Sequence, residues 1–284
     1  MKTQSQLFRL KWTLCVVPGL LLAFAAGCAG SGGKRVEAAI PPEKRLADAR
    51  KAVARHPNDP DALYRMGNAL FDLQRYQDAV TAYEGVLAID PKHVAAQVNL
   101  GLSLKRLNRL PEAIEHYKAA LALAPDDRVT LCDLAAAQES KGDLDEAAKT
   151  LSRLAELYPD DIQVLSRQAN VLFKLRRYDE AADVFEKVIK KDPGLSDDYY
   201  NLGLCRFHQE NYDAALRTWL AALAHEPRNR SVNKGLAVLY WKRHEYKQAW
   251  EAVARCQSMG IPLDPEFLDH LRNDSGLSDP PSGK

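Results

Sequence analysis

Residues 60–91 read PDALYRMGNALFDLQRYQDAVTAYEGVLAIDP. The stretch holds two amphipathic segments separated by a polar Gln-Arg break. In the first segment, Leu63, Met66 and Leu70 follow the three- and four-residue spacing of one helical face. Pro91 ends the second segment, because proline lacks an amide hydrogen and disfavours helical geometry in the residue before it. The stretch therefore predicts an antiparallel pair of short helices.

The same pattern returns every 34 residues along the chain. Prolines occupy one position of the repeat: Pro57, Pro91, Pro125, Pro159, Pro193 and Pro227. Alanines occupy a second position: Ala79, Ala113, Ala147, Ala181, Ala215 and Ala249. A fixed period of this length is typical of stacked copies of one unit that cannot bury its apolar face alone. The ladders predict an all-α stack of helix pairs.

A third position of the repeat always holds a small residue: Gly67, Gly101, Ala135, Ala169, Gly203 and Ala237. We expect this position, in the first helix of each pair, to face the alanine ladder of the second helix. Small residues on both sides would let the two backbones approach closely, with larger side chains packing around the contact.

These ladders resemble the tetratricopeptide repeat, whose signature has Leu-Gly in the first helix, Ala and an aromatic residue in the second, and Pro near the end. Two units carry the closest matches: Asn99-Leu100-Gly101 with Ala113, Tyr117 and Pro125, and Asn201-Leu202-Gly203 with Ala215, Trp219 and Pro227. The units that begin at residues 128 and 162 match less well, with Leu134-Ala135 and Gln168-Ala169 at the Leu-Gly pair. The resemblance implies an all-α, right-handed α-solenoid whose concave groove is lined by the first helices.

Six units cover residues 60–259, with the last one closing by residue 261. Their bounds are 60–93, 94–127, 128–161, 162–195, 196–229 and 230–261. Solenoid ends are expected to be atypical. We therefore predict a lone capping helix in 42–59, which resembles a second helix, and a short closing segment in 262–272. Residues 273–284 are rich in Ser, Asp, Pro and Gly and are predicted to be disordered.

The first 27 residues have the pattern of an export signal. Lys2, Arg9 and Lys11 precede a short apolar run, which is interrupted by Pro18-Gly19 and is short for a membrane span. The sequence Ala25-Ala26-Gly27-Cys28 then resembles the bacterial lipobox, although Ala25 stands where Leu is commonest. The resemblance implies lipidation of Cys28 and cleavage before it. Cleavage after Ala25, at a small-x-small site, is the alternative.

Lipidation would fix the location of the chain. Several acyl chains on Cys28 anchor a protein stably, because each buried CH₂ contributes about 0.8 kcal/mol. Ala29, rather than Asp, follows the cysteine, and by analogy with Gram-negative sorting this favours the outer membrane, facing the periplasm. Residues 28–41 are rich in Gly, Ser and Ala and are predicted to be a flexible linker.

Composition and motifs argue against several functional classes. Loss of Lys2, Arg9 and Lys11 with the signal would change the net charge from +1 to −2, whereas nucleic-acid binding needs a basic stripe. The seven histidines do not cluster, and no HExxH, CxxC, P-loop or GxSxG spacing occurs. We expect no enzyme, no cofactor and no metal. Cys132, Cys205 and Cys256 are expected to be unpaired packing residues.

Paired acids recur where first helices begin, at Asp126-Asp127, Asp160-Asp161 and Asp197-Asp198. We interpret them as helix caps that also complement the helix dipole. The family's carboxylate-clamp constellation is not expected, because Val129 and Asp133 stand where cations are needed.

The groove positions of the family give a candidate binding surface. They correspond to Tyr64, Arg65, Asn68, Asn99, Leu102, Asp133, Arg167, Asn170, Tyr200, Asn201, Leu204 and Lys234. Carboxamides there can pair with the backbone of an extended peptide, since one amide both donates and accepts. An excess of cations in the rear half favours an acidic segment: Arg167, Lys174, Lys234 and Lys242 against Asp197.

The resulting hypothesis is a membrane-anchored protein–protein interaction scaffold of the bacterial cell envelope. Its groove would bind a protein or peptide segment, for assembly of a pilus or secretin, outer-membrane or cell-wall complex. Two alternatives remain open: a soluble periplasmic adaptor without lipid, and an accessory or regulatory subunit of an envelope enzyme.

Overall fold

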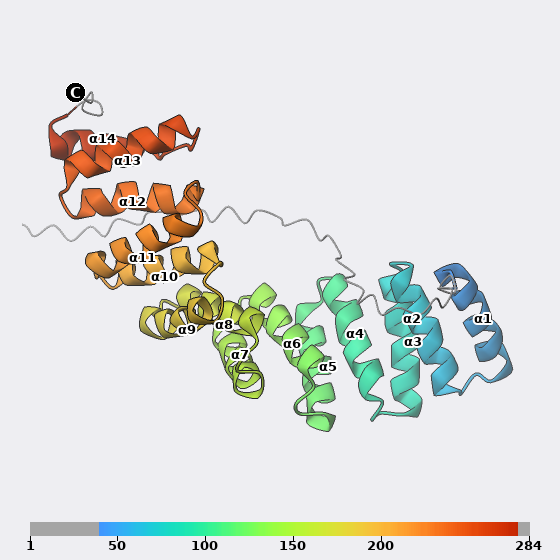
Figure 1. Cartoon of the computed structure of the whole chain (residues 1–284). Helices are drawn as coiled ribbons and strands as arrows, with labels where there is room; N and C mark the ends of the chain where they lie inside the picture. Colours follow the sequence, from blue (N-terminus) through green and yellow to red (C-terminus); the bar gives the residue numbers. More distant parts are fainter. Residues whose placement is uncertain (1–39, 278–284) are drawn as a thin grey trace, which may run out of the picture. The chain divides into compact units, whose positions relative to one another are not determined.

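A computed structural model describes residues 40–277, which form fourteen α-helices (Figure 1). The chain divides into one unit of residues 1–39 and a second unit from Ile40 onward, to which all described residues belong. The predictions for the signal peptide, Cys28, the linker up to residue 39 and residues 278–284 lie outside the described residues.

Six helix pairs follow a single leading helix. The leading helix is α1 (Pro42–Arg55). The first helices of the pairs are α2 (Pro60–Asp72), α4 (Val94–Arg106), α6 (Arg128–Lys141), α8 (Ile162–Lys174), α10 (Ser196–His208) and α12 (Arg230–Lys242). The second helices are α3 (Tyr76–Ile89), α5 (Leu110–Leu123), α7 (Leu144–Leu157), α9 (Tyr178–Lys191), α11 (Tyr212–His225) and α13 (Tyr246–Ser258). Helix α14 (Pro265–Ser275) closes the series.

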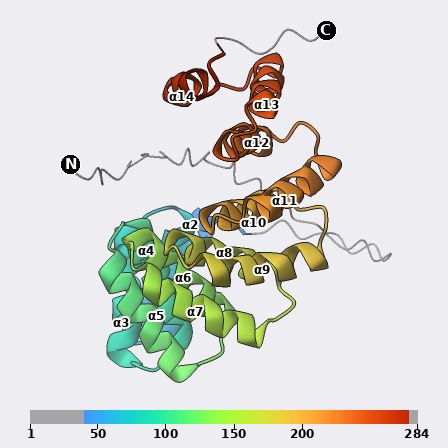
Figure 2. The same cartoon turned by 90° about the vertical axis from the view of Figure 1, so that its left-hand side faces the viewer.

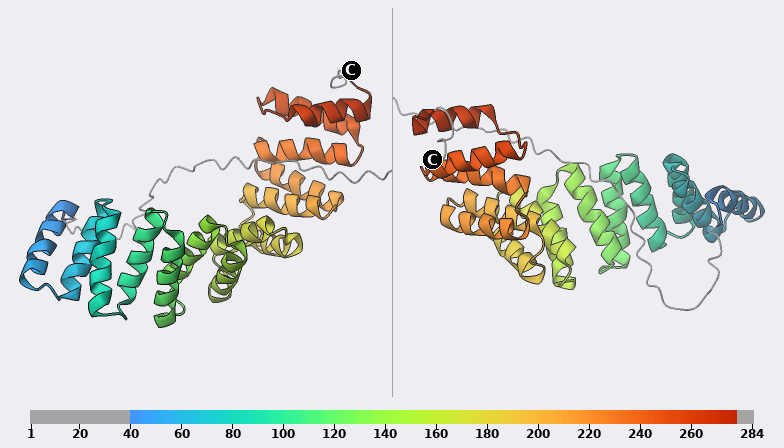
Figure 3. Two further views of the ribbon diagram at one scale, coloured as in Figure 1. Left: turned by 180° about the vertical axis from the view of Figure 1, so that it is seen from behind. Right: turned by 45° about the horizontal axis from the view of Figure 1, so that its top comes forward.

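Each helix packs against its neighbours in sequence, and the buried apolar side chains lie between them in several clusters along the stack. Figures 1 and 3 show this order from front and back, with successive helices side by side from α1 to α14. No strand occurs among residues 40–277. The predicted all-α solenoid of stacked helix pairs is confirmed.

Five of the six first helices begin at a capping side chain, because the first amides of a helix have no partner within it. Asp59, Asp127 and Asp161 each accept a hydrogen bond from an amide of the following turn. Asp197 and Asp198 differ from the prediction, since Leu195 holds the cap position and both acids lie inside the first turn of α10.

A residue with positive φ connects the first to the second helix of every pair. Gly142 fills this place in the third unit, with φ of 91°. The other units hold a non-glycine residue there: Gln74, Asn108, Arg176, Glu210 and His244, with φ between 58° and 60°. The left-handed conformation costs these side-chain-bearing residues energy that glycine would not incur.

The small position of the first helix lies against a large side chain four residues beyond the ladder alanine of the second helix. A Cβ atom at Gly67 would lie 2.5 Å from the ring of Tyr83, and one at Gly203 would lie 2.0 Å from Nε1 of Trp219. The small residue therefore makes room for the large side chain sixteen positions later, which crosses from the second helix. Units with Gly here carry Tyr83, Tyr117 or Trp219, and units with Ala carry Leu151, Phe185 or Val253.

Helix α14 covers the apolar end of the last pair. Phe267 packs against Trp241 with ring centroids 5.8 Å apart, and Trp250 Nε1 donates to Ser275 Oγ at 3.2 Å. The helix continues to Ser275, three residues into the segment predicted to be disordered, where Gly276 ends it with φ of 68°.

The three cysteines of the described residues are unpaired. Cys205 and Cys256 are buried in the core, as expected for packing residues, and Cys132 is half-buried on α6.

Candidate functional site

The first helices form the inner face of the stack. Contacts skip the intervening second helix at α2–α4, α4–α6, α8–α10 and α10–α12, so first helices approach one another across units. Figure 2 shows α4, α6 and α8 in one row and α3, α5 and α7 in another. The predicted groove residues all lie on first helices. Arg65 is exposed, whereas the other predicted site residues are half-buried.

Four side chains from three helices meet in the front half of the groove. Asn99 Nδ2 donates to Asn68 Oδ1 at 2.9 Å and to Tyr64 Oη at 3.0 Å. Tyr83 Oη, which comes from α3, donates to the same Asn68 oxygen at 2.8 Å. We call Tyr64, Asn68, Tyr83 and Asn99 the front amide cluster. Burial is the main cause that raises the pKa of Tyr83, so its hydroxyl keeps the proton it donates.

The network leaves one polar atom without a partner on each amide. Both hydrogens on Asn99 Nδ2 are used inside the cluster, and Asn68 Oδ1 accepts two bonds. Two amide groups, Asn68 Nδ2 and Asn99 Oδ1, have no hydrogen-bond partner among residues 40–277. The cluster thus offers one donor and one acceptor side by side.

Both amides line a hollow of about 300 Å³. Its other lining residues are Arg45, Phe71, Asp72, Tyr83 and Leu102. Phe71 and Leu102 supply apolar walls, and the Arg45–Asp72 ion pair, at 2.7 Å, borders it. The hollow thus combines two apolar walls with several polar groups, and convergent polar groups of this kind orient a ligand in a binding site.

An equivalent arrangement lies 102 residues further along, three units later. Asn201 Nδ2 donates to Asn170 Oδ1 at 3.2 Å, in the same sense as Asn99 to Asn68. We call these two residues the rear amide pair. Ser166 and Phe185 replace Tyr64 and Tyr83, so no tyrosine hydroxyl supports this pair.

Ion pairs cross the groove between the two amide sites. Lys105 Nζ lies 2.5 Å from Asp133 Oδ1, and their side chains are only 20% and 22% exposed. Arg167 Nε lies 2.6 Å from Glu139 Oε1, and Lys174 lies 3.7 Å from the same carboxylate. Arg167 is therefore bound to a neighbouring unit, and the predicted cationic character of the rear groove is weaker than the sequence count indicates.

The remaining predicted residues have mixed surroundings. Tyr200 stacks near Trp219, with ring centroids 5.9 Å apart, and its carbonyl accepts from Trp219 Nε1 at 3.0 Å. Lys234 is half-buried on α12, and Lys242 lies 4.4 Å from the centre of the Trp241 ring. Tyr200 is thus largely a packing residue. The sequence did not predict that Tyr83 takes part in the groove, because it lies on a second helix. The one signal in the sequence is its place sixteen residues after Gly67.

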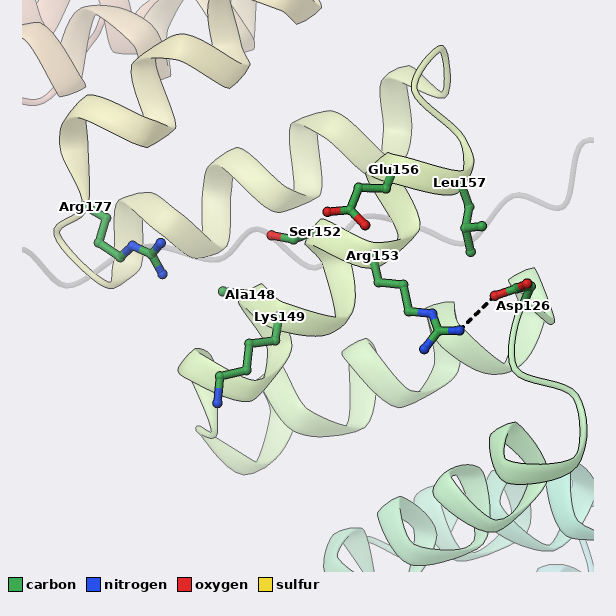
Figure 4. Close-up of a pocket in the computed structure, with 8 residues that line it drawn as sticks. All are labelled: Asp126, Ala148, Lys149, Ser152, Arg153, Glu156, Leu157 and Arg177. Atoms are coloured by element: carbon green, nitrogen blue, oxygen red, sulfur yellow. Dashed lines mark hydrogen bonds and ion pairs between the residues drawn. The ribbon is translucent and has the colours of Figure 1, made fainter.

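A larger hollow, of about 630 Å³, lies over α7 (Figure 4). Its lining includes Lys149, Arg153 and Arg177, but each of these cations is bound to an acid: Glu146, Asp126 and Glu180, respectively. These three cations are therefore already paired, and Glu156 also lines the hollow. The smaller groove hollow, with its free amide groups, is the better candidate.

Within residues 40–277, no group of three or more His, Cys, Asp or Glu side chains is arranged to hold a metal ion. In the same part of the chain, no helix combines the length and hydropathy needed to cross a membrane.

The repeat pattern matches family models directly. A model of the tetratricopeptide repeat matches residues 43–92, 64–128, 166–229 and 200–257, and a second model of the same repeat matches 104–171. The chain therefore belongs to the tetratricopeptide repeat family, whose members generally act as interaction scaffolds.

Solved structures share the fold. The C-terminal part of a TPR repeat-containing protein from Cytophaga hutchinsonii is 16% identical, with a TM-score of 0.68 over 81% of this chain and 94% of that one. YrrB, described as a TPR protein with an unusual peptide-binding site, is 22% identical, with a TM-score of 0.58 over 66% and 96%. MamA from Desulfovibrio magneticus is 27% identical, with a TM-score of 0.50 over 54% and 87%. None of the curated proteins matches the chain.

Proposed function

We propose that this protein is a membrane-anchored scaffold of the bacterial cell envelope that holds an extended segment of a partner protein in its groove. The observation that carries the proposal is the pair of free amide atoms on Asn68 and Asn99, which line a hollow with apolar walls from Phe71 and Leu102. A free donor and a free acceptor complement a peptide backbone, whose every residue carries both. The proposal is supported by YrrB, a protein of the same fold that has a peptide-binding site.

Anchoring through lipid on Cys28 is the second part of the proposal and rests on the sequence alone. Mass spectrometry of the mature N-terminus, with palmitate labelling, tests it. A lipid-modified Cys28 at the N-terminus supports anchoring. An unmodified terminus at Ala26 supports the soluble adaptor instead and leaves the groove unaffected.

The groove is tested with Asn68→Asp. Aspartate keeps an oxygen to accept from Tyr83 and Asn99, but it replaces the groove-facing NH₂ with an acceptor. The probe is a set of random 16-residue peptides displayed on phage, selected on the purified protein and then synthesised. We expect the variant to bind the selected peptides about tenfold more weakly, since a lost hydrogen bond with repulsion costs about 1.5 kcal/mol or more.

Gln77→Glu is the matched control, because it adds one negative charge at an exposed position on α3. It should bind the selected peptides with unchanged affinity. Equal binding by wild-type protein and Asn68→Asp would show that the groove is not the site used. Thermal melts of both variants check that neither has lost stability.

A further inference from the structure

We propose that the outer face of α1 docks on the anionic phospholipid surface of the membrane in which the protein is anchored. The inference rests on the anchoring part of the proposed function and names the surface that meets the bilayer. It is independent of what the groove holds. The observation behind it is a row of three exposed cations on the helix that ends the stack.

Helix α1 lies at one end of the stack (Figure 1) and packs against α2. Its buried residues are Leu46 and Ala49, and Leu46 belongs to the core cluster shared with α2 and α3. At about 100° per residue, Lys44, Lys51 and Arg55 lie within about 40° of one another, on the side of the helix opposite the buried pair. All three are exposed. We call them the basic row, which is about 16 Å long at about 1.5 Å per residue.

The fold makes little use of these charges. Lys44 and Arg55 form no ion pair with any residue in 40–277. Lys51 Nζ lies 3.9 Å from Asp48 Oδ1, and the two side chains are 71% and 58% exposed. An exposed pair of this kind contributes little to stability. Asp48 lies beside the basic row and offsets one of its three charges, which leaves a net charge of +2 on this face.

Helix α1 is more basic than the second helices that it resembles. It holds five Lys or Arg and two acids, a net charge of +3. The six second helices have net charges between −2, in α3, and +1, in α13. A solenoid end needs a polar face for solubility, but charges of either sign provide one. Four or more Lys or Arg on one amphipathic helix are typical of segments that bind anionic lipid headgroups.

The lipid anchor would hold this face near the membrane. Cys28, the predicted lipidation site, precedes Pro42 by fourteen residues. A flexible linker of this length has an end-to-end distance of about 20 Å, so α1 would be the helix nearest the bilayer. Each Lys or Arg close to an anionic lipid surface strengthens binding about fivefold. The net charge of +2 on the outer face would therefore favour the docked arrangement about 25-fold at low salt.

The test uses the full mature lipoprotein, reconstituted at low density into vesicles of phosphatidylcholine alone or with one third phosphatidylglycerol. A neutral acetylating reagent is applied briefly, and mass spectrometry measures the labelling of each lysine. We expect labelling of Lys44 and Lys51 to be at least about threefold lower on the anionic vesicles. High salt should restore it, because salt screens these charges. Lys187 and Lys190, which are exposed on α9, should be labelled equally on both kinds of vesicle.

Two variants separate docking from mere closeness to the membrane. Lys51→Gln combined with Arg55→Gln removes two cations of the basic row and keeps Lys44 as the reporter. On anionic vesicles, labelling of Lys44 in this variant should rise to the level seen on neutral vesicles. Lys187→Gln combined with Lys190→Gln is the matched control, because it removes the same charge and should leave Lys44 protected. Equal protection of Lys44 in both variants would show that the basic row is not a docking surface.

The outcomes distinguish this inference from the anchoring on which it rests. A protein that carries no acyl chain and washes off vesicles of both compositions would overturn anchoring, and the inference with it. A protein that stays on both kinds of vesicle, with Lys44 and Lys51 labelled equally on the two, would overturn the inference alone. Peptide binding by the groove is unaffected by either result.

Discussion

Replacing Gly203 with alanine tests the contact that shapes the fifth unit. A Cβ atom there would lie 2.0 Å from Nε1 and 2.4 Å from Cδ1 of Trp219. The indole has little room to retreat, since it is 1% exposed, its Nε1 bonds to the Tyr200 carbonyl, and Gly235 lies against its other edge. The substitution must displace a large buried ring or its hydrogen bond.

The magnitude follows from three effects. Overpacking costs about 1–3 kcal/mol, and loss of a buried hydrogen bond costs about 1 kcal/mol. Alanine in a helix interior stabilises the helix by about 1 kcal/mol relative to glycine. We expect Gly203→Ala to lower the free energy of unfolding by about 1–3 kcal/mol, which corresponds to a fall in Tm of about 2–4 °C for each kcal/mol in a chain of this size.

Circular dichroism at 222 nm during thermal and urea unfolding measures the effect. Gly85→Ala is the matched control, because a Cβ there would lie 3.4 Å from Leu63 Cδ1, an ordinary contact, so it should raise stability. Trp219→Leu with Gly203→Ala copies the Ala135 and Leu151 pair of the third unit. In a protein that already carries Trp219→Leu, Gly203→Ala should lower the free energy of unfolding much less than it does in the wild-type protein. If Gly203→Ala is as stable as Gly85→Ala, the proposed steric role of the small position is refuted.

Three further predictions concern single side chains. Tyr83→Phe should lower the free energy of unfolding by about 1 kcal/mol, because it removes a hydroxyl that donates a hydrogen bond to Asn68. Tyr117→Phe should leave the free energy of unfolding unchanged, because the buried Tyr117 hydroxyl has no partner among the described residues. Urea unfolding of the two variants measures the difference. Arg176→Gly should raise Tm by an amount that corresponds to about 1 kcal/mol, because glycine adopts the φ of 60° at this position without steric cost. An unchanged thermal melt would contradict this prediction. Burial raises the pKa of Asp198 in the folded state. The free energy of unfolding therefore falls as pH rises above the ordinary pKa of aspartate, because the carboxyl ionises more readily in the unfolded chain. Asp198→Asn should therefore increase stability at pH 7 but not at pH 3, as measured by urea titrations at the two pH values.

The sequence alone predicted an all-α stack of helix pairs, which the structure shows. The periodic prolines and apolar faces are local signals, and they place helix boundaries because helix formation depends on nearby residues. The repeat position also predicted Asn68, Asn99, Asn170 and Asn201 as groove residues, and the structure has all four on first helices.

Only the tertiary structure decided what those groups can do. The free atoms of Asn68 and Asn99 depend on a tyrosine from the neighbouring helix and on contacts across a unit. The binding of Arg167 to Glu139 likewise joins residues 28 apart. The role of the small position also required the structure, because steric fit depends on which side chain crosses from the opposite helix. Repeat patterns specify where residues lie, whereas hydrogen-bond partners and close contacts arise from packing between units.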